Sequence, residues 1–220
     1  MNKILTALVA AFMLLTFCGC GESGGGSTVA KDEVQQQSQS TEWSIEGDTL
    51  VLTGSTRMFD YNTYEVENES IPWFFEKENF SSVKVNDGVT HIGTFSFYRF
   101  ENIKTAEIAG TVDSIGSSAF AFCENLKKVT LGEGVREIGM GAFGSCKSLE
   151  EINIPSTVTK IDKGAFYGCS SLEKLEIPST VTVFGDDLFT DCSSLTIYCE
   201  EGSAAQTQAE KYGVNCKIVK

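Results

Sequence analysis

The segment Val158–Pro178, with the sequence VTKIDKGAFYGCSSLEKLEIP, decides the fold because its pattern recurs every 23 residues. Five columns keep this register over five units, and a period of this length is typical of stacked repeats, because one unit cannot bury its own apolar face. The Phe column is Phe97, Phe120, Phe143, Phe166 and Phe189. The other four columns begin at Val89, Ile92, Phe100 and Ile103, and the third of them continues with Cys123, Cys146, Cys169 and Cys192.

Within one unit the apolar and polar residues alternate over a short stretch. Leu172, Leu175 and Ile177 alternate with charged residues, which predicts a strand with one buried face that ends at Pro178. Val158–Ile161 is a second short extended run, and the turn after it carries a Phe and a Cys inward. We therefore predict a β-rich solenoid over 81–198, with about five 23-residue coils and strands about 4.8 Å apart.

Both ends of the array are expected to carry caps, because an open solenoid exposes a sheet edge and an apolar disc. The N-terminal β cap is placed at 41–80, with a hairpin around Gly47 and Asp48. The C-terminal cap is placed at 199–220, with Ser203 capping a helix over Ala204–Tyr212 and a closing strand after Gly213.

The recurring pattern V-T-x-I-G-x-x-A-F-x-x-C-x-x-L-x-x-V-x-I-P resembles the BspA-like class of bacterial leucine-rich repeats over roughly Val83 to Tyr198. The flanking sequences WSIEGDTLVLTG and YCEEGSAAQTQAEKYG are similar to the caps of such proteins. Most departures from the pattern lie in the terminal units, which are atypical in repeat arrays. The resemblance implies a surface protein that adheres to host or microbial proteins.

The N-terminus predicts export. Lys3 and the apolar run Ile4–Phe17 are typical of a signal peptide, placed at 1–19. The end of this run, FCGC, resembles a bacterial lipobox and implies a lipid on Cys20, while an ordinary signal peptide or a retained anchor are the alternatives. The Gly-, Ser- and Gln-rich segment 20–40 is expected to be a flexible tether. We therefore predict a lipid-anchored protein on the extracellular face of a bacterial membrane.

The composition limits the partners. The formal net charge of −13 disfavours nucleic acid and anionic lipid, so contact with the membrane is expected only through the lipid anchor. No cofactor is predicted. The chain has no CxxC motif and one histidine, which argues against zinc. The oxygen-rich segment Asp60–Glu69 lacks the Gly and the final Glu of a calcium loop, so no metal is predicted there.

The chain has eight cysteines, and the four in the repeat column are expected to be buried, unreactive thiols. Cys199 and Cys216 lie outside this column, in a terminal coil and in the closing strand. Neighbouring strands could bring them together, so a disulfide and two unpaired thiols both remain open.

An enzyme is disfavoured because the sequence lacks the necessary residues. His91 is the only histidine, no nucleophile motif accompanies it, and we expect it at the surface. The carboxylate pairs Asp186-Asp187 and Glu150-Glu151 are expected to be solvated surface charge.

The outward positions of the main strands predict a charged face without aromatic residues. As a possible protein-binding face we take the charged residues Lys127, Lys128, Glu150, Glu151, Glu173, Lys174 and Glu176. The alternative is a merely solvated face. Aromatic residues crowd the N-terminal cap instead, where most should be core and one or two exposed. We expect an extracellular or host protein as the partner, and a surface carbohydrate as the alternative.

Overall fold

The computed structural model describes residues 41–61 and 70–219. The predicted signal peptide 1–19, the lipidation at Cys20, the tether 20–40 and most of the oxygen-rich segment lie outside the described residues. The compact unit that contains the repeats extends from Gln39 to Lys220.

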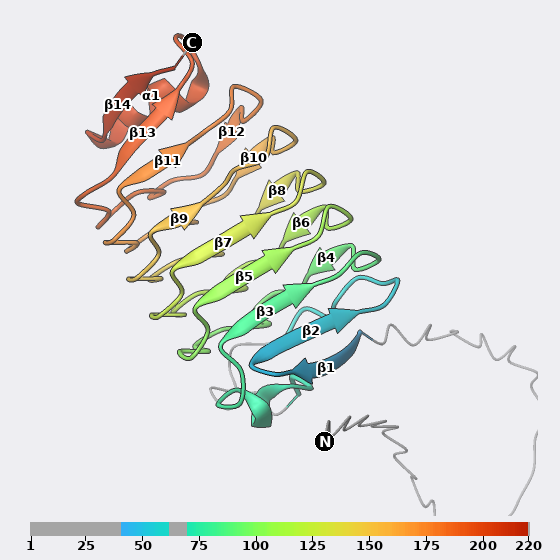
Figure 1. Cartoon of the computed structure of the whole chain (residues 1–220). Coiled ribbons are helices and arrows are strands. Elements are labelled where there is room, and N and C mark those ends of the chain that lie inside the picture. The colour runs from blue at the N-terminus through green and yellow to red at the C-terminus, as the bar shows by residue number, and fades with distance from the viewer. Residues whose placement is uncertain (1–40, 62–69, 220) are drawn as a thin grey trace, which may run out of the picture. The chain divides into compact units, whose positions relative to one another are not determined.

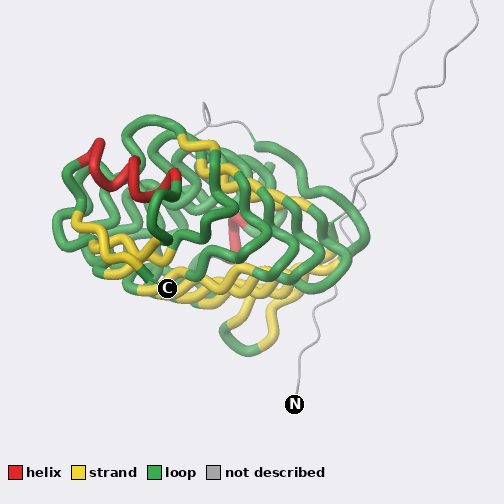
Figure 2. The backbone as a smooth tube through the Cα atoms, turned by 90° about the horizontal axis from the view of Figure 1, so that it is seen from above, coloured by secondary structure: helices red, strands yellow, loops and turns green. Residues whose placement is uncertain are grey.

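The repeats form a β-solenoid in which each coil supplies one strand to a main row and one to a second sheet (Figures 1 and 2). The main row contains β3 (Ser82–Val85), β5 (Thr105–Ile108), β7 (Lys128–Leu131), β9 (Glu151–Ile152), β11 (Lys174–Glu176) and β13 (Thr196–Cys199). The second sheet contains β4 (His91–Ile92), β6 (Ser114–Ile115), β8 (Glu137–Ile138), β10 (Lys160–Ile161) and β12 (Val183–Phe184). Paired strands are parallel, and Ile115 lies opposite Ile138, which confirms the 23-residue register.

A stack of phenylalanine rings runs through the interior of the coils. Each of the five rings from Phe97 to Phe189 is at most 3% exposed. Successive ring centroids are 4.7, 5.6, 5.9 and 6.5 Å apart, and the ring planes are within 16° of parallel. The inward orientation predicted for this column is therefore confirmed.

The turn that follows each second-sheet strand uses left-handed backbone at two positions four residues apart. In one coil glycines occupy both, as Gly164 (φ 61°) and Gly168 (φ 70°). Two coils earlier the second position is Phe122, with φ 60°. A side chain in this conformation costs roughly 1–2 kcal/mol, so the fold favours glycine here without requiring it.

The N-terminal cap begins with the predicted hairpin. β1 (Glu42–Glu46) pairs antiparallel with β2 (Thr49–Thr53) across Gly47, whose φ is 66°. β2 then pairs in parallel with β3, so the hairpin starts the main sheet. The short 3-10 helix η1 (Phe74–Glu76) follows in the same cap.

The C-terminal cap has the predicted helix and strand. In α1 (Ala204–Tyr212), the Ser203 Oγ accepts a hydrogen bond from the backbone N of Gln206 at 3.3 Å, and Gly213 ends the helix with φ 64°. β14 (Asn215–Ile218) then pairs in parallel with β13. Within 41–61 and 70–219, no helix is long and apolar enough to cross a membrane.

Candidate binding surface

The face of the main strands carries the charge pattern that the sequence predicts. Each of the seven candidate residues is exposed, and basic residues of one coil meet acidic residues of the next. Lys127 Nζ lies 3.7 Å from Glu150 Oε1, and Lys128 Nζ lies 2.8 Å from Glu151 Oε1. These side chains are 51–67% exposed, and such pairs contribute only about 0–1 kcal/mol each. The charge is therefore available for recognition rather than needed for the fold.

The main row of strands is interrupted between β9 and β11. β9 ends a six-stranded sheet, whereas β11 begins a separate three-stranded sheet with β13 and β14. The hydrogen-bonded ladder expected between strands about 4.8 Å apart therefore does not continue from β9 to β11. Instead, Lys174 pairs with Glu176 of its own strand at 3.8 Å, and its Nζ lies 4.6 Å from the centroid of the Tyr198 ring.

The contact between two successive main strands is called a joint below. At the joint between β7 and β9, a proline replaces a residue whose backbone N–H is bonded at the joint between β3 and β5. Between β3 and β5, the backbone N of Ala109 donates to the Val85 carbonyl at 3.0 Å. Pro155 occupies the position of Ala109 two coils later and has no N–H. The Asn153 side chain replaces it: Nδ2 donates to the Leu131 carbonyl and Oδ1 accepts from the Leu131 N, both at 2.8 Å.

At the interrupted joint no such replacement exists. Pro178 occupies the proline position again, but Glu176 stands where the previous coil has Asn153. A carboxylate has no N–H to donate to the Ile154 carbonyl. At this position the two strands therefore lack both the backbone donor and its side-chain substitute, and the ladder does not continue from β9 to β11.

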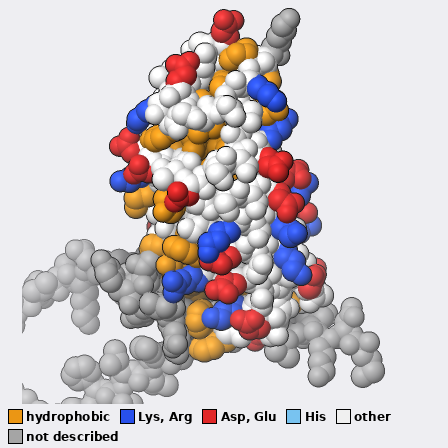
Figure 3. Space-filling view, turned by 90° about the vertical axis from the view of Figure 1, so that its left-hand side faces the viewer, with side chains coloured by type: hydrophobic (Ala, Val, Ile, Leu, Met, Phe, Trp, Pro, Cys, Tyr) orange, Lys and Arg blue, Asp and Glu red, His pale blue; other side chains and the backbone are white. Residues whose placement is uncertain are grey.

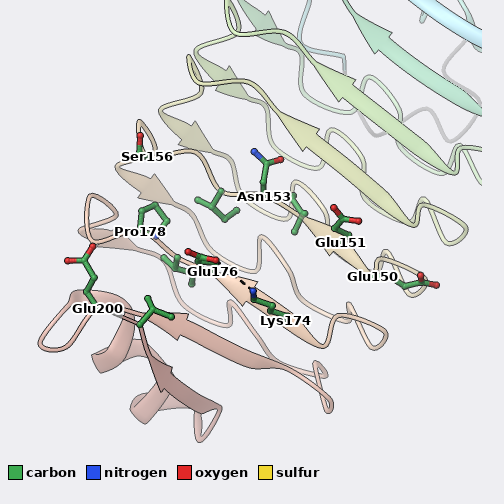
Figure 4. A pocket seen from close by; sticks show the side chains of 12 residues that line it. Glu150, Glu151, Asn153, Ser156, Lys174, Glu176, Pro178 and Glu200 are labelled. Atoms are coloured by element: carbon green, nitrogen blue, oxygen red, sulfur yellow. Dashed lines mark ion pairs between the residues drawn. The ribbon is translucent and has the colours of Figure 1, made fainter.

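A hollow of about 470 Å³ lies along this interruption. Its charged lining consists of Glu150 and Glu151 from the β9 side, Lys174 and Glu176 from the β11 side, and Glu200 (Figure 4). Acidic groups therefore outnumber basic ones. Ile152, Ile154, Ile177, Pro178 and Val219 supply its apolar part.

Four of the seven sequence-predicted residues line this hollow, whereas Lys127, Lys128 and Glu173 do not. Sequence reasoning missed Asn153 and Glu200 as part of the site. The sequence nevertheless contains a signal. Pro155 and Pro178 occupy the same position in successive coils, but the residue two places earlier is Asn153 in one coil and Glu176 in the other.

A second exposed surface is aromatic and lies at the turns of the first coils. Tyr98 makes edge contacts with Phe95 and Phe122, with centroids 5.5 Å apart in both pairs, and the Arg99 guanidinium lies 5.6 Å from the Tyr98 and Phe122 rings. The ring planes meet at 77–85°, so they do not form the coplanar platform that would favour a sugar. In the space-filling view, hydrophobic side chains reach the surface in a band beside alternating acidic and basic ones (Figure 3).

In the N-terminal cap, Phe59 and Phe75 are 54% and 72% exposed, whereas Trp73 and Phe80 are buried. Trp43, Tyr61 and Phe74 are partly buried and pack against the core. Among the cap aromatics that the structure describes, two are therefore exposed and the others belong to the core or pack on it.

The cysteine column consists of buried thiols, as predicted. The Sγ atoms of Cys123, Cys146, Cys169 and Cys192 each donate to a backbone carbonyl 26 residues earlier, at 3.0–3.2 Å. Burial raises the pKa of these thiols, in the case of Cys192 to about 11. Thiols that stay protonated are poor nucleophiles, so the column contributes to packing.

The prediction that His91 lies at the surface is wrong. The residue is 5% exposed, because the segment around Asp60 packs over β4. Its Nδ1 is 2.7 Å from Ser114 Oγ, its Nε2 is 3.4 Å from Asp60 Oδ1, and burial lowers its pKa. Burial raises the pKa of Asp60, but hydrogen bonds from Thr94, Arg57 and His91 outweigh it and hold that pKa far below its usual value. In the part of the chain that the structure describes, no three His, Cys, Asp or Glu side chains are grouped as metal ligands.

The fold and the repeat pattern define a class of leucine-rich-repeat β-solenoids. A family model described as "BspA type Leucine rich repeat region" matches six copies over residues 72–196. The chain belongs to this family. No curated protein matches it.

Solved structures agree on the fold. The leucine-rich repeat protein of T. pallidum is 25% identical with a TM-score of 0.55, and the match covers 72% of this chain and 68% of that chain. A leucine-rich repeat protein from Bacteroides ovatus is 26% identical with a TM-score of 0.50, over 64% of this chain and 43% of that chain. A leucine rich cell surface protein from Faecalibacterium prausnitzii is 24% identical with a TM-score of 0.46, over 81% and 55%, a likeness too distant to support an argument about function.

Proposed function

We propose that this protein is an exported, non-enzymatic binding protein that contacts another protein through its main strand face, with the hollow between β9 and β11 at the centre. The observation that carries the proposal is that exposed charged residues of three successive coils lie on one strand face, beside an interruption whose hollow has both charged and apolar walls. Membership of a leucine-rich-repeat family supports a binding or adhesion role, because such repeats offer extended surfaces.

The chemistry of the partner follows from the excess of carboxylates. Glu150, Glu151, Glu176 and Glu200 line the hollow with one Lys174, and the whole chain has a net charge of −13. Lys127 and Lys128 pair with Glu150 and Glu151 from outside the lining, so Glu200 and the net charge of the chain leave the surface acidic. A protein with a basic segment and a few apolar side chains would complement this surface. Long-range attraction would speed its encounter, while each exposed ion pair would add little affinity. Many copies on one cell surface would then raise the strength of attachment.

The proposed location is the outside of a bacterial cell, with the chain attached through a lipid on Cys20. The basic start, the apolar run and the small residue before Cys20 support it. Mass spectrometry of the protein from its native membrane should find acylated Cys20 as the first residue. A mature protein that retains Met1 would contradict this part of the proposal.

The binding role is tested by crosslinking. A chain that begins at Gln39, where the compact unit begins, is incubated with extracellular and host protein extracts and treated with a carbodiimide, which joins carboxylates to lysine amines. Peptides joined to a second protein, as distinct from links within the chain such as Lys128 to Glu151, should contain Glu150, Glu151 or Glu176. A parallel incubation with a glycan array examines the carbohydrate alternative, whose best surface is the aromatic cluster around Tyr98. Binding to glycans together with no protein crosslink would favour that alternative.

A further inference from the structure

Cys199 and Cys216 meet where the last coil joins the C-terminal cap. Cys199 is the last residue of β13, and Cys216 lies in the parallel neighbour β14, opposite Ile197. The two cysteines are therefore diagonal neighbours on adjacent strands. Their Sγ atoms are in contact, 2.7 Å apart.

The setting of this pair differs from that of the four column cysteines. Each column thiol donates to a backbone carbonyl, whereas Cys199 and Cys216 have each other as partners. Cys199 is buried, but Cys216 is partly exposed and can be reached from solvent. One sulfur is thus accessible to a reagent, and the second is already placed to react with the first.

We propose that Cys199 and Cys216 are a modification site, at which a disulfide bond forms after export and fastens the C-terminal cap to the last coil. The oxidant is the disulfide of an oxidoreductase or of a small thiol such as glutathione. The Cys216 thiol loses its proton and attacks one sulfur of that disulfide, which releases the other sulfur as a thiol. The Cys199 thiol then loses its proton and attacks Cys216 Sγ, which releases the second reagent thiol. Two electrons pass to the reagent, and its two sulfurs take up the two protons.

The bond would act on an end strand of the solenoid. β14 pairs only with β13 in its sheet, so it is the end strand that the cap exposes. A crosslink between residues 17 apart in sequence removes freedom from the unfolded chain and prevents this strand from fraying. The oxidised cap would protect the sheet edge more permanently than hydrogen bonds alone.

Peptide mapping tests the proposal on the full-length chain exported by a bacterial host. Free thiols are blocked with N-ethylmaleimide in denaturant, and the protein is digested with trypsin without reduction. The peptide Leu175–Lys211, which contains Cys199, should be linked to Tyr212–Lys217, which contains Cys216. Cys192 in the first peptide should carry the blocking group. Cys192→Ser should leave the link unchanged, whereas Cys216→Ser should abolish it.

The inference rests on the proposed export. A second experiment distinguishes a failure of export from a failure of the cysteine pairing. The purified, reduced full-length chain is incubated with oxidised glutathione in vitro, which requires no export. The link should form, and its reduction should lower the melting temperature by about 5 °C or more. The melting temperature of Cys216→Ser should not respond to reductant. If Cys199 and Cys216 remain fully blockable after oxidation in vitro, or if Cys192 forms the link instead, the proposal is wrong. A link that forms only in vitro would contradict export and not the pairing.

Discussion

The joints on the two sides of β9 have the same proline position but different outcomes. Between β7 and β9, Asn153 supplies the donor that Pro155 lacks, and the sheet continues. Between β9 and β11, Glu176 cannot do this for Pro178, and the sheet stops. The two joints therefore differ in whether a side chain two residues before the proline can donate a hydrogen bond to the preceding coil. The core nevertheless stays continuous across these coils, since Phe143 and Phe166 remain stacked.

The largest effect on stability is expected from the phenylalanine stack, which runs through the coils on both sides of β9. The Phe143 ring is fully buried, with Phe120 at 5.6 Å and Phe166 at 5.9 Å between centroids. Phe143→Ala leaves a cavity in the ring stack and should lower the free energy of unfolding by about 3–5 kcal/mol in urea titrations. The exposed Phe75→Ala is the control and should change it by less than about 0.5 kcal/mol. Equal effects would show that the stack is not the main source of stability.

A smaller effect on stability is expected when the Asn153 hydrogen bonds between the β7 and β9 coils are removed. Asn153→Ala removes both hydrogen bonds to the partly buried backbone of Leu131, which should cost about 1–3 kcal/mol. Hydrogen exchange of the Leu131 amide should accelerate. Asn125→Ala is the control, because the Asn125 side chain bonds the Glu101 carbonyl on an exposed turn. Unchanged exchange at Leu131 would mean that Asn153 does not hold this joint.

The smallest effect on stability is expected from the reverse change. Pro178→Ala supplies an N–H that can reach the Ile154 carbonyl, so the new amide should be protected from exchange, with a stability change below about 1 kcal/mol. Pro155→Ala is the matched control, because Asn153 already occupies the Leu131 carbonyl. If both new amides exchange equally fast, the missing donor is not what separates β9 from β11.

The sequence alone was enough to predict the solenoid, its register and the inward Phe and Cys columns, because these follow from a 23-residue apolar period. It also predicted the N-terminal hairpin and the C-terminal helix from short signals such as Gly47 and Ser203. The interruption after β9 was not predicted, since it concerns contacts between coils: Asn153 bonds Leu131 across the continuous joint, and Glu176 cannot make the equivalent bond to Ile154. The burial of His91 depends in the same way on where the segment around Asp60 packs. Tertiary contacts of this kind leave no periodic signal.

The most direct test of the central claim is to reverse the charge at the hollow. Glu150→Lys/Glu151→Lys is compared with Asp113→Lys/Glu137→Lys, which makes the same charge change at exposed positions next to and within the second sheet. Affinity for a crosslinked partner protein is measured at about 50 and 300 mM salt. We predict that the parent and the control lose affinity with salt, and that the Glu150/Glu151 variant binds at least about tenfold more weakly at low salt. Equal affinity of the two variants, without salt dependence, would contradict a binding site on the main strand face.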